Sequence, residues 1–372
     1  MIKKKILVAP LDWGLGHATR CIPIIKLLLE EGAEVFVAAD KAPYELLIRE
    51  FPTVKFITFP GIAIEYPKGT MGIGFIFRVI PKMLKQIAIE HAFLEELIEE
   101  YGFDIVISDN RYGLYAAKTK TVFITHQVIV KTSPWLAFLS PLIFLMSKHF
   151  IQKFDVLWIP DVASKENLSG ALSHSFIIPK ITRFIGILSR FNAPFSVKRE
   201  IKYDLCAIIS GPEPARTAFY DLILKEIAKT SLRAIVFAGI PGKNSTPIPF
   251  ANGVIYPHLD TDAMQAAILA SSLVVSRSGY STIMDLATLG VPAIFVPTPG
   301  QTEQSYLAAR LMKKGVAFSQ KQADFDLLAA LIAAKAFKGF REIGKIDSVF
   351  GDADSLIEAV IEILDDDAPK TV

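Results

Sequence analysis

Residues 276–309 read SRSGYSTIMDLATLGVPAIFVPTPGQTEQSYLAA, and this stretch decides the fold of the C-terminal half. An apolar run at 272–276 predicts a strand, which leads through Arg277 and Gly279 into a helix. Such a turn binds anions, because the first N–H groups of a helix have no partner and glycine admits close approach. The hydroxyl donors of the turn are Ser278, Ser281 and Thr282. The pattern predicts a phosphate site, although an ordinary capped helix would look the same.

Two features downstream narrow the kind of anion. Asp285 lies in the first turns of the predicted helix, where its carboxylate could accept both hydroxyls of a ribose. An apolar strand at 293–297 follows, and the loop after it carries Glu303 and Gln304. Ligands of parallel sheets bind beyond the carboxyl ends of the strands, so this loop and the turn would face one crevice. The stretch therefore predicts a nucleotide-sugar site, with plain solvation of the loop as the alternative.

Residues 276–309 resemble the donor-binding signature of MurG-like glycosyltransferases, which have a C-terminal domain of the glycosyltransferase family 28 type. The match includes the turn at Arg277, the acid six residues after Gly279, the run GVPAIFVP at 290–297, and Gln304. The resemblance implies an α/β fold of the GT-B type, in which two Rossmann-like doubly wound domains face each other across a cleft. It also implies an enzyme that transfers a sugar from a UDP-sugar with inversion.

Strands and helices alternate in both halves of the chain, which predicts two parallel sheets covered by helices. The pattern weakens through a loop-rich linker at 162–202 and restarts at Leu205. We therefore expect an acceptor-binding domain at 1–195, with the linker beginning near its residue 162, and a nucleotide-sugar-binding domain at 196–350. The resemblance implies that the helix within 351–372 returns to the first domain.

Composition fits an enzyme of two domains and argues against several other classes of protein. The 372 residues are 51% hydrophobic, enough for two cores, and a net charge of +2 gives no basis for nucleic-acid binding. Cys21 and Cys206 are far apart and indicate a reducing compartment rather than a disulfide framework. The N-terminus reads as a first strand and not as a signal peptide, so we expect a cytoplasmic protein.

The strongest N-terminal feature is DWGLGHATR at 12–20, a glycine turn between the first predicted strand and helix. Gly14 and Gly16 also fit half of a dinucleotide fingerprint with Asp40 as the ribose acid, but the third glycine is missing. MurG-like enzymes carry a glycine loop ending in histidine here, facing the cleft. The resemblance therefore implies that His17 deprotonates the acceptor or binds diphosphate, since both of its protonation states are accessible near neutral pH. A capping histidine without chemistry is the alternative.

Two further strands end in polar residues that would line the same cleft. Asp109 follows the strand at 105–108 and could orient His17 or act as the base. His126 and Gln127 follow the next strand and could hold the acceptor, although each could equally be a strand-end cap. The acceptor-site candidates are Gly14, Gly16, His126 and Gln127.

The C-terminal domain departs from the family at SGPEPAR, residues 210–216, where the relatives have Gly-Gly-Ser-X-Gly. Pro212 and Pro214 remove N–H donors, so this loop would make fewer bonds to phosphate, and the identity of the donor stays open. His258 and Leu259 align, across a short gap, with the segment that binds uracil in the family. The donor-site candidates are Ser210, Gly211, Arg216, His258, Leu259, Arg277, Ser278, Gly279, Tyr280, Ser281, Thr282, Asp285, Glu303 and Gln304.

The sequence offers no Asp-X-Asp pair at a strand end and no zinc-binding spacing. We therefore expect no metal and no cofactor beyond the UDP-sugar co-substrate, with Arg277 and the helix start stabilising the leaving group. The predicted function is the inverting, metal-independent transfer of GlcNAc or another hexose from a UDP-sugar to a carbohydrate or lipid-linked acceptor. A UDP-sugar 2-epimerase of the same fold and a non-catalytic nucleotide-sugar-binding protein are the alternatives.

Residues 70–85 suggest contact with a membrane surface, because Arg78, Lys82 and Lys85 share one helical face and apolar residues share another. The apolar stretch at 135–146 is too short to span a bilayer. MurG-like enzymes meet lipid-linked acceptors through the N-terminal domain, so the resemblance implies a peripheral place on the inner face of the cell membrane. Both stretches would instead be core if they are buried.

Overall fold

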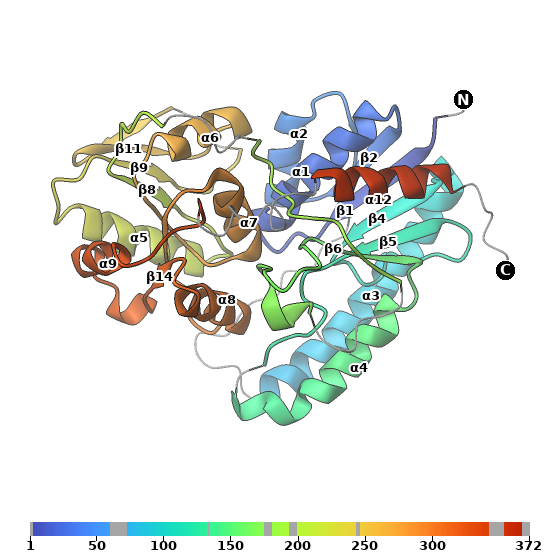
Figure 1. The fold of residues 1–372 in the computed structure, drawn as a ribbon. Coiled ribbons are helices and arrows are strands. Elements are labelled where there is room, and N and C mark those ends of the chain that lie inside the picture. The colour runs from blue at the N-terminus through green and yellow to red at the C-terminus, as the bar shows by residue number, and fades with distance from the viewer. Residues whose placement is uncertain are drawn as a thin grey trace.

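The chain folds into two α/β lobes, each built on a seven-stranded sheet (Figure 1). The computed structural model describes residues 3–59, 73–132, 134–174, 181–192, 199–242, 246–341 and 353–366. The α/β class and the two-sheet organisation expected from alternating strands and helices are confirmed.

The N-terminal sheet has the strand order β3-β2-β1-β4-β5-β6-β7, and all of its pairs are parallel. Its strands are β1 (Lys5–Pro10), β2 (Glu34–Ala39), β3 (Lys55–Thr58), β4 (Ile105–Asp109), β5 (Lys120–Ile124), β6 (Val156–Ile159) and β7 (Thr182–Phe184). Its helical segments are α1 (Leu15–Glu30), α2 (Lys41–Glu50), α3 (Ile73–Tyr101), η1 (Pro134–Leu139), α4 (Ser140–Ile151) and η2 (Gly170–Leu172). The central strands are mostly apolar because helices cover both faces of a parallel sheet.

The C-terminal sheet has the strand order β10-β11-β9-β8-β12-β13-β14. Its strands are β8 (Leu205–Ile208), β9 (Ala234–Phe237), β10 (Ile248–Phe250), β11 (Gly253–Tyr256), β12 (Val274–Ser276), β13 (Ala293–Phe295) and β14 (Phe318–Ser319). Its helical segments are α5 (Ala215–Ile227), α6 (Thr261–Leu269), α7 (Tyr280–Leu289), α8 (Thr302–Lys313), η3 (Gln322–Asp324) and α9 (Leu327–Ala334). The edge strand β10 pairs antiparallel with β11, a hairpin that the sequence pattern did not predict.

The interpretation of residues 162–202 as a linker was too broad. This stretch contains β7, which pairs with β6 through Leu157 and Thr182 and completes the N-terminal sheet. A strand of three half-buried residues is too short to show an alternating pattern, so it could not be predicted from the sequence.

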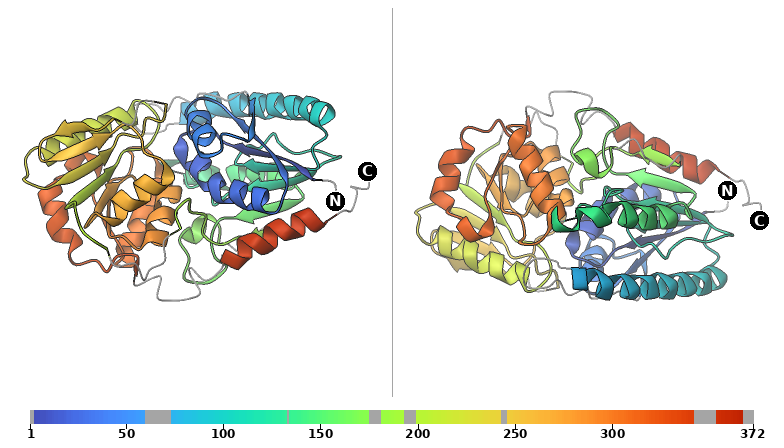
Figure 2. Two further views of the ribbon diagram at one scale, coloured as in Figure 1. Left: turned by 90° about the horizontal axis from the view of Figure 1, so that it is seen from above. Right: turned by 90° about the horizontal axis from the view of Figure 1, so that it is seen from below.

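The last described helix, α12 (Ala353–Asp365), lies across the N-terminal lobe although the chain reaches it from the other lobe (Figures 1 and 2). Val360 and Ile363 are buried, and Arg183 of β7 forms ion pairs with Glu358 and Glu362. Helix α12 therefore packs on the lobe that contains α1. Among the described residues, none of the helices combines the length and apolar character needed to cross a bilayer.

Candidate active site

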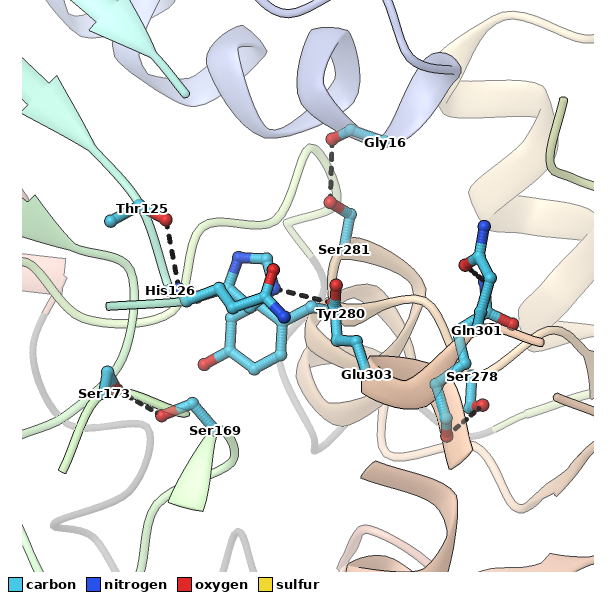
Figure 3. Close-up of polar contacts among 12 residues, drawn as sticks. Gly16, Thr125, His126, Ser169, Ser173, Ser278, Tyr280, Ser281, Gln301 and Glu303 are labelled. Atoms are coloured by element: carbon cyan, nitrogen blue, oxygen red, sulfur yellow. Dashed lines mark hydrogen bonds and ion pairs between the residues drawn. The ribbon is translucent and has the colours of Figure 1, made fainter. Parts of the chain in front are cut away.

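The candidate site lies where the starts of α1 and α7 meet between the lobes (Figure 3). Ser281, in the first turn of α7, donates its hydroxyl proton to the carbonyl oxygen of Gly16 at 2.7 Å. A Cβ on residue 16 would lie 3.2 Å from Ser281 Oγ, so the close approach favours glycine. The first N–H groups of both helices, which have no partner within their own helix, therefore lie near one another.

A buried charge cluster borders this junction on the N-terminal side. Asp109, at the end of β4, accepts hydrogen bonds from Nε of Arg20 at 2.8 Å and from its Nη2. Nδ1 of His17 lies 3.2 Å from Asp109 Oδ2 and 2.9 Å from Arg20 Nη2. Arg20 follows His17 by three residues on α1, so the helix turns both side chains toward the same carboxylate.

The pKa shifts of His17 and Asp109, the two predicted catalytic residues, indicate different roles for them. Burial opposes ionisation of Asp109, but Arg20 and His17 outweigh it and hold the pKa of Asp109 well below its usual range. Burial lowers the pKa of His17, and Arg20 adds to this while Asp109 opposes it. Asp109 is therefore a poor proton acceptor at neutral pH, and its geometry suits the orientation of His17. His17 is neutral there, as a general base must be.

His126 joins this cluster to the C-terminal lobe. Its Nδ1 lies 3.0 Å from Arg20 Nη1, and its Nε2 lies 2.8 Å from Oε1 of Glu303 at the start of α8 (Figure 3). Its ring stacks on Tyr280 with centroids 4.2 Å apart and planes at 5°. Burial raises the pKa of Glu303, but His126 outweighs it and the net shift is downward. Glu303 is thus an ionised carboxylate held across the junction.

Tyr280 was a candidate for contact with the donor, and the structure gives it another role. The side chain is 2% exposed, and its hydroxyl donates to the carbonyl oxygen of Pro160 at 2.9 Å. One face of the ring is covered by His126. Tyr280 therefore fixes the orientation of His126 and is closed to a nucleotide in this arrangement.

Arg277 also differs from its expected role at the leaving group. Its guanidinium is buried and donates to the carbonyl oxygens of Val296, Pro297 and Ala215 and to the side chain of Gln322. It lies 4.0 Å from the ring centroid of Phe219, and burial lowers its pKa to about 9. These contacts turn the charge into the domain, so Arg277 supports the turn from within.

The loop between β13 and α8 is held by its own polar side chains. Oε1 of Gln304 accepts the N–H of Thr298, and its Nε2 donates to Gln301, each at 2.8 Å. Ser278 donates its hydroxyl proton to the carbonyl oxygen of Gln304 (Figure 3). Ser278 and Gln304, both predicted to bind substrate, thus stabilise the loop. Glu303 remains partly exposed, with 27% of its side chain accessible.

Asp285 lies in the second turn of α7, at a place where the linker reaches the C-terminal lobe. Ser189 donates its hydroxyl proton to Asp285 Oδ1 at 2.7 Å, and Arg190 Nε lies 3.8 Å from Oδ2. Burial raises the pKa of Asp285 to about 6, with Arg190 and Ser189 opposing the rise. Ser189 and Arg190 were not predicted, because a contact 96 residues apart leaves no mark in local sequence patterns.

His258 lies in the same neighbourhood, since Arg190 affects both groups. Burial lowers the pKa of His258 to about 4, and Arg190 and Arg49 add to the effect. The ring is therefore neutral and 8% exposed, and the following residue Leu259 packs against the core. The predicted contacts to ribose and base, Asp285 and His258, are thus brought together around the linker.

The remaining candidates lie in the loops that follow strands or in the first turns of helices. Gly14 and Gly211 follow β1 and β8 with φ of 108° and 112°, a conformation that favours glycine. Arg216 donates to the carbonyl oxygen of Ala238 and pairs with Glu213. The other candidates, which are half-buried, are Gln127, Ser210, Gly279 and Thr282. Across the described ranges, no three His, Cys, Asp or Glu side chains gather as ligands for a metal ion.

Comparison with known proteins agrees with this geometry. Residues 245–339 match the model of the glycosyltransferase family 28 C-terminal domain. The chain is 24% identical to a Haemophilus ducreyi protein named UDP-N-acetylglucosamine--N-acetylmuramyl-(pentapeptide) pyrophosphoryl-undecaprenol N-acetylglucosamine transferase, over 87% of each chain. The chain is a MurG-like glycosyltransferase.

Two further similarities extend over nearly the whole transferase. A protein of Methanosarcina acetivorans, named an uncharacterized glycosyltransferase, is 26% identical over 84% of this chain and 82% of its own length. The crystal structure of Acinetobacter baumannii MurG superposes with a TM-score of 0.56 at 15% identity, and the match covers 97% of this chain and 99% of that chain. The GT-B fold predicted for the enzyme is confirmed.

Proposed function

We propose that this enzyme transfers a hexose, with GlcNAc as the first candidate, from a UDP-sugar to a carbohydrate or lipid-linked acceptor. Transfer inverts the anomeric carbon and uses no metal. His17 takes the proton of the acceptor hydroxyl, the hydroxyl oxygen attacks the anomeric carbon, and UDP leaves from the opposite face. The printed name of the Haemophilus ducreyi relative, which contains UDP-N-acetylglucosamine, supports the choice of donor.

The observation that carries this proposal is the cluster around His17. With both imidazoles neutral, the cluster contains the charges of Arg20, Asp109 and Glu303 and therefore has a net charge of one negative unit. When His17 takes up a proton, the net charge of the cluster becomes zero. Such a cluster lowers the free energy of the protonated base as the acceptor loses its proton.

The donor half of the proposal rests on the start of α7 and on the linker contacts. The diphosphate lies at the N–H groups of Gly279 to Thr282, where the helix dipole stabilises charge on the leaving group. The ribose hydroxyls take the place of Ser189 at Asp285, and the base lies toward His258 and Leu259. Glu303 accepts hydrogen bonds from hydroxyls of the sugar.

Product analysis with purified enzyme tests the reaction. UDP release that depends on an added acceptor, together with a β-linked product from an α-linked UDP-sugar, supports inverting transfer. His17→Ala lowers kcat by about a hundredfold or more, because general-base catalysis contributes at least that much. His91→Asn, on α3 beside Tyr115, is the matched histidine control and keeps full activity. A changed sugar on UDP without transfer would instead identify an epimerase.

A lipid-linked acceptor requires contact with a membrane surface, which we propose for η1 and α4. Phe138, Leu142 and Leu145 form one stripe at helical spacing and are 64%, 53% and 60% exposed. Lys82 and Lys85 of α3 are also exposed, whereas the side chains of residues 70–79, including Arg78, lie outside the described part. The proposed apolar contact thus moves from residues 70–85 to the stretch at 135–146, which the sequence showed to be apolar but too short to span a bilayer.

Flotation with vesicles of anionic and neutral lipid tests this surface. We expect binding to anionic vesicles that falls about tenfold or more when Phe138, Leu142 and Leu145 are all changed to Ser, since burial of each side chain is worth roughly 1.5–3 kcal/mol. Lys82→Gln with Lys85→Gln weakens binding to anionic vesicles only. Binding that ignores both sets of changes excludes this surface.

A further inference from the structure

Arg20 is the centre of the catalytic cluster, although no sequence motif singled it out. The side chain is 2% exposed. Its guanidinium contacts Asp109 through Nε and Nη2, His17 through Nη2 at 2.9 Å, and His126 through Nη1 at 3.0 Å. The groups whose charges act on Arg20 and His17 are Asp109, Cys21, His126 and Glu303.

The chemistry of a guanidinium determines the tautomer of His126. An arginine side chain has five N–H donors and no acceptor, so Nδ1 of His126 must accept. The neutral ring then carries its proton on Nε2, which donates to Glu303 Oε1 at 2.8 Å. A proton on Nδ1 would point at the guanidinium, so Arg20 makes this ring an acceptor at Nδ1 and a donor at Nε2.

Nδ1 of His17 lies beside both a hydrogen-bond acceptor, Asp109, and a hydrogen-bond donor, Arg20. In one tautomer, Nδ1 carries the proton and donates it to Asp109, and Nε2 is left with a free lone pair. In the other tautomer, Nδ1 accepts a hydrogen bond from Arg20, and the proton is on Nε2. Only the first form accepts a proton from a hydroxyl through Nε2. The position of the guanidinium therefore decides how much of His17 is ready to act as a base.

We propose that Arg20 is a positioning residue that sets the tautomers of His17 and His126 and so couples Glu303 of the donor lobe to the base of the acceptor lobe. Glu303 holds His126, and His126 holds Nη1 of Arg20 in place. Separation of the lobes removes Glu303, frees the ring of His126 and loosens the guanidinium beside His17. The catalytic effect rests on the proposed role of His17 as base, whereas the tautomers do not.

Nitrogen NMR of wild-type protein labelled with 15N-histidine tests the tautomers without any activity. At neutral pH we expect His126 with Nε2 protonated and Nδ1 bare, assigned by loss of its signals in His126→Gln. His149, an exposed histidine of α4, provides the comparison signals. A proton on Nδ1 of His126 in the folded protein overturns the proposal even if the enzyme is an active transferase.

Two substitutions at His126 test whether this residue acts as a neutral hydrogen-bond donor or as a charged or proton-transferring group. His126→Gln keeps one acceptor and one donor, whereas His126→Leu keeps neither. We expect Gln to retain kcat within about tenfold of wild type and Leu to lose about a hundredfold, with both proteins folded by circular dichroism. Equal loss in both variants contradicts the proposal.

Arg20→Lys tests the guanidinium itself, because lysine preserves the charge beside Asp109 and cannot reach both histidines from one nitrogen. We expect kcat to fall about tenfold or more while KM for the UDP-sugar stays within about twofold. The signals of His126 should shift toward a mixture of tautomers. A loss of rate with unchanged tautomers in the folded variant assigns Arg20 a purely structural role.

Discussion

The two sides of the junction shift the pKa of a buried aspartate in opposite directions. On the N-terminal side, Asp109 is fully buried and bonded twice to Arg20, and its pKa is held well below its usual range. On the C-terminal side, Asp285 has one hydroxyl donor and an arginine at 3.8 Å, and its pKa rises to about 6. The negative charge of Asp109 is therefore balanced by neighbouring residues of its own lobe, whereas the negative charge of Asp285 is balanced only in part.

In the proposed mechanism, this difference follows from the task of each side. A general base must be oriented before the substrates arrive, so its partners come from the protein. A carboxylate that binds ribose hydroxyls must exchange the Ser189 contact for the ligand, and weak compensation makes the exchange less costly. Four measurements test the difference between Asp109 and Asp285 and the contact between the two helix starts.

Asp109→Asn removes the charge that compensates buried Arg20. We expect a loss of about 3–5 kcal/mol in the free energy of unfolding at neutral pH, because an unpaired buried charge remains. Urea unfolding followed by circular dichroism measures it. The double variant Arg20→Met with Asp109→Leu removes both charges and should recover most of the loss while staying inactive. Equal instability of the single and double variants would show that the ion pair is not the cause.

Asp285→Asn should have the opposite effect on stability. The pKa of Asp285 rises from 3.8 to about 6 on folding, so wild-type stability from this group is complete below pH 3.8 and is lost as the pH rises through 6. The variant should gain about 2 kcal/mol relative to wild type between about pH 4 and pH 7.5. Urea unfolding at several pH values checks this. A difference that does not change with pH argues against a raised pKa.

Uridine binding should strengthen as Asp285 ionises. Uridine has no phosphate that titrates in this range, so a change in its Kd reports on the protein. We expect Kd to fall about threefold to tenfold between about pH 5 and pH 7.5, since hydrogen bonds to a carboxylate are stronger than those to the neutral acid. Calorimetry measures Kd, and Asp285→Asn should abolish the dependence. A flat profile for wild type would place the ribose elsewhere.

Gly16→Ala tests the contact between the helix starts. The new Cβ would lie 3.2 Å from Ser281 Oγ, so a shift of a few tenths of an ångström is required. We expect a loss of about 1 kcal/mol or less, and Ser281→Ala in the same chain should recover part of it. The double-mutant cycle is measured by thermal unfolding. Additive effects of the two changes would mean that the lobes do not touch here in solution.

The regular elements could be predicted well because they depend on local patterns. The strand predicted at 105–108 is β4, which ends one residue later, and the strand predicted at 293–297 contains β13. The short strands β7, β10 and β14 carried too little pattern to be seen, since two or three residues do not define a period. Arg20 offered a signal that was missed, a cation three residues after His17 on one helical face.

Apolar periodicity and glycine placement act over a few residues, so local patterns were enough to predict the two α/β domains, the glycine turn before α7 and the histidine loop before α1. No local pattern revealed that Tyr280 stacks on His126, that Arg277 points inward or that Ser189 meets Asp285. These contacts join residues from separate elements, and their energies depend on burial and on distances between groups. A local pattern contains neither quantity.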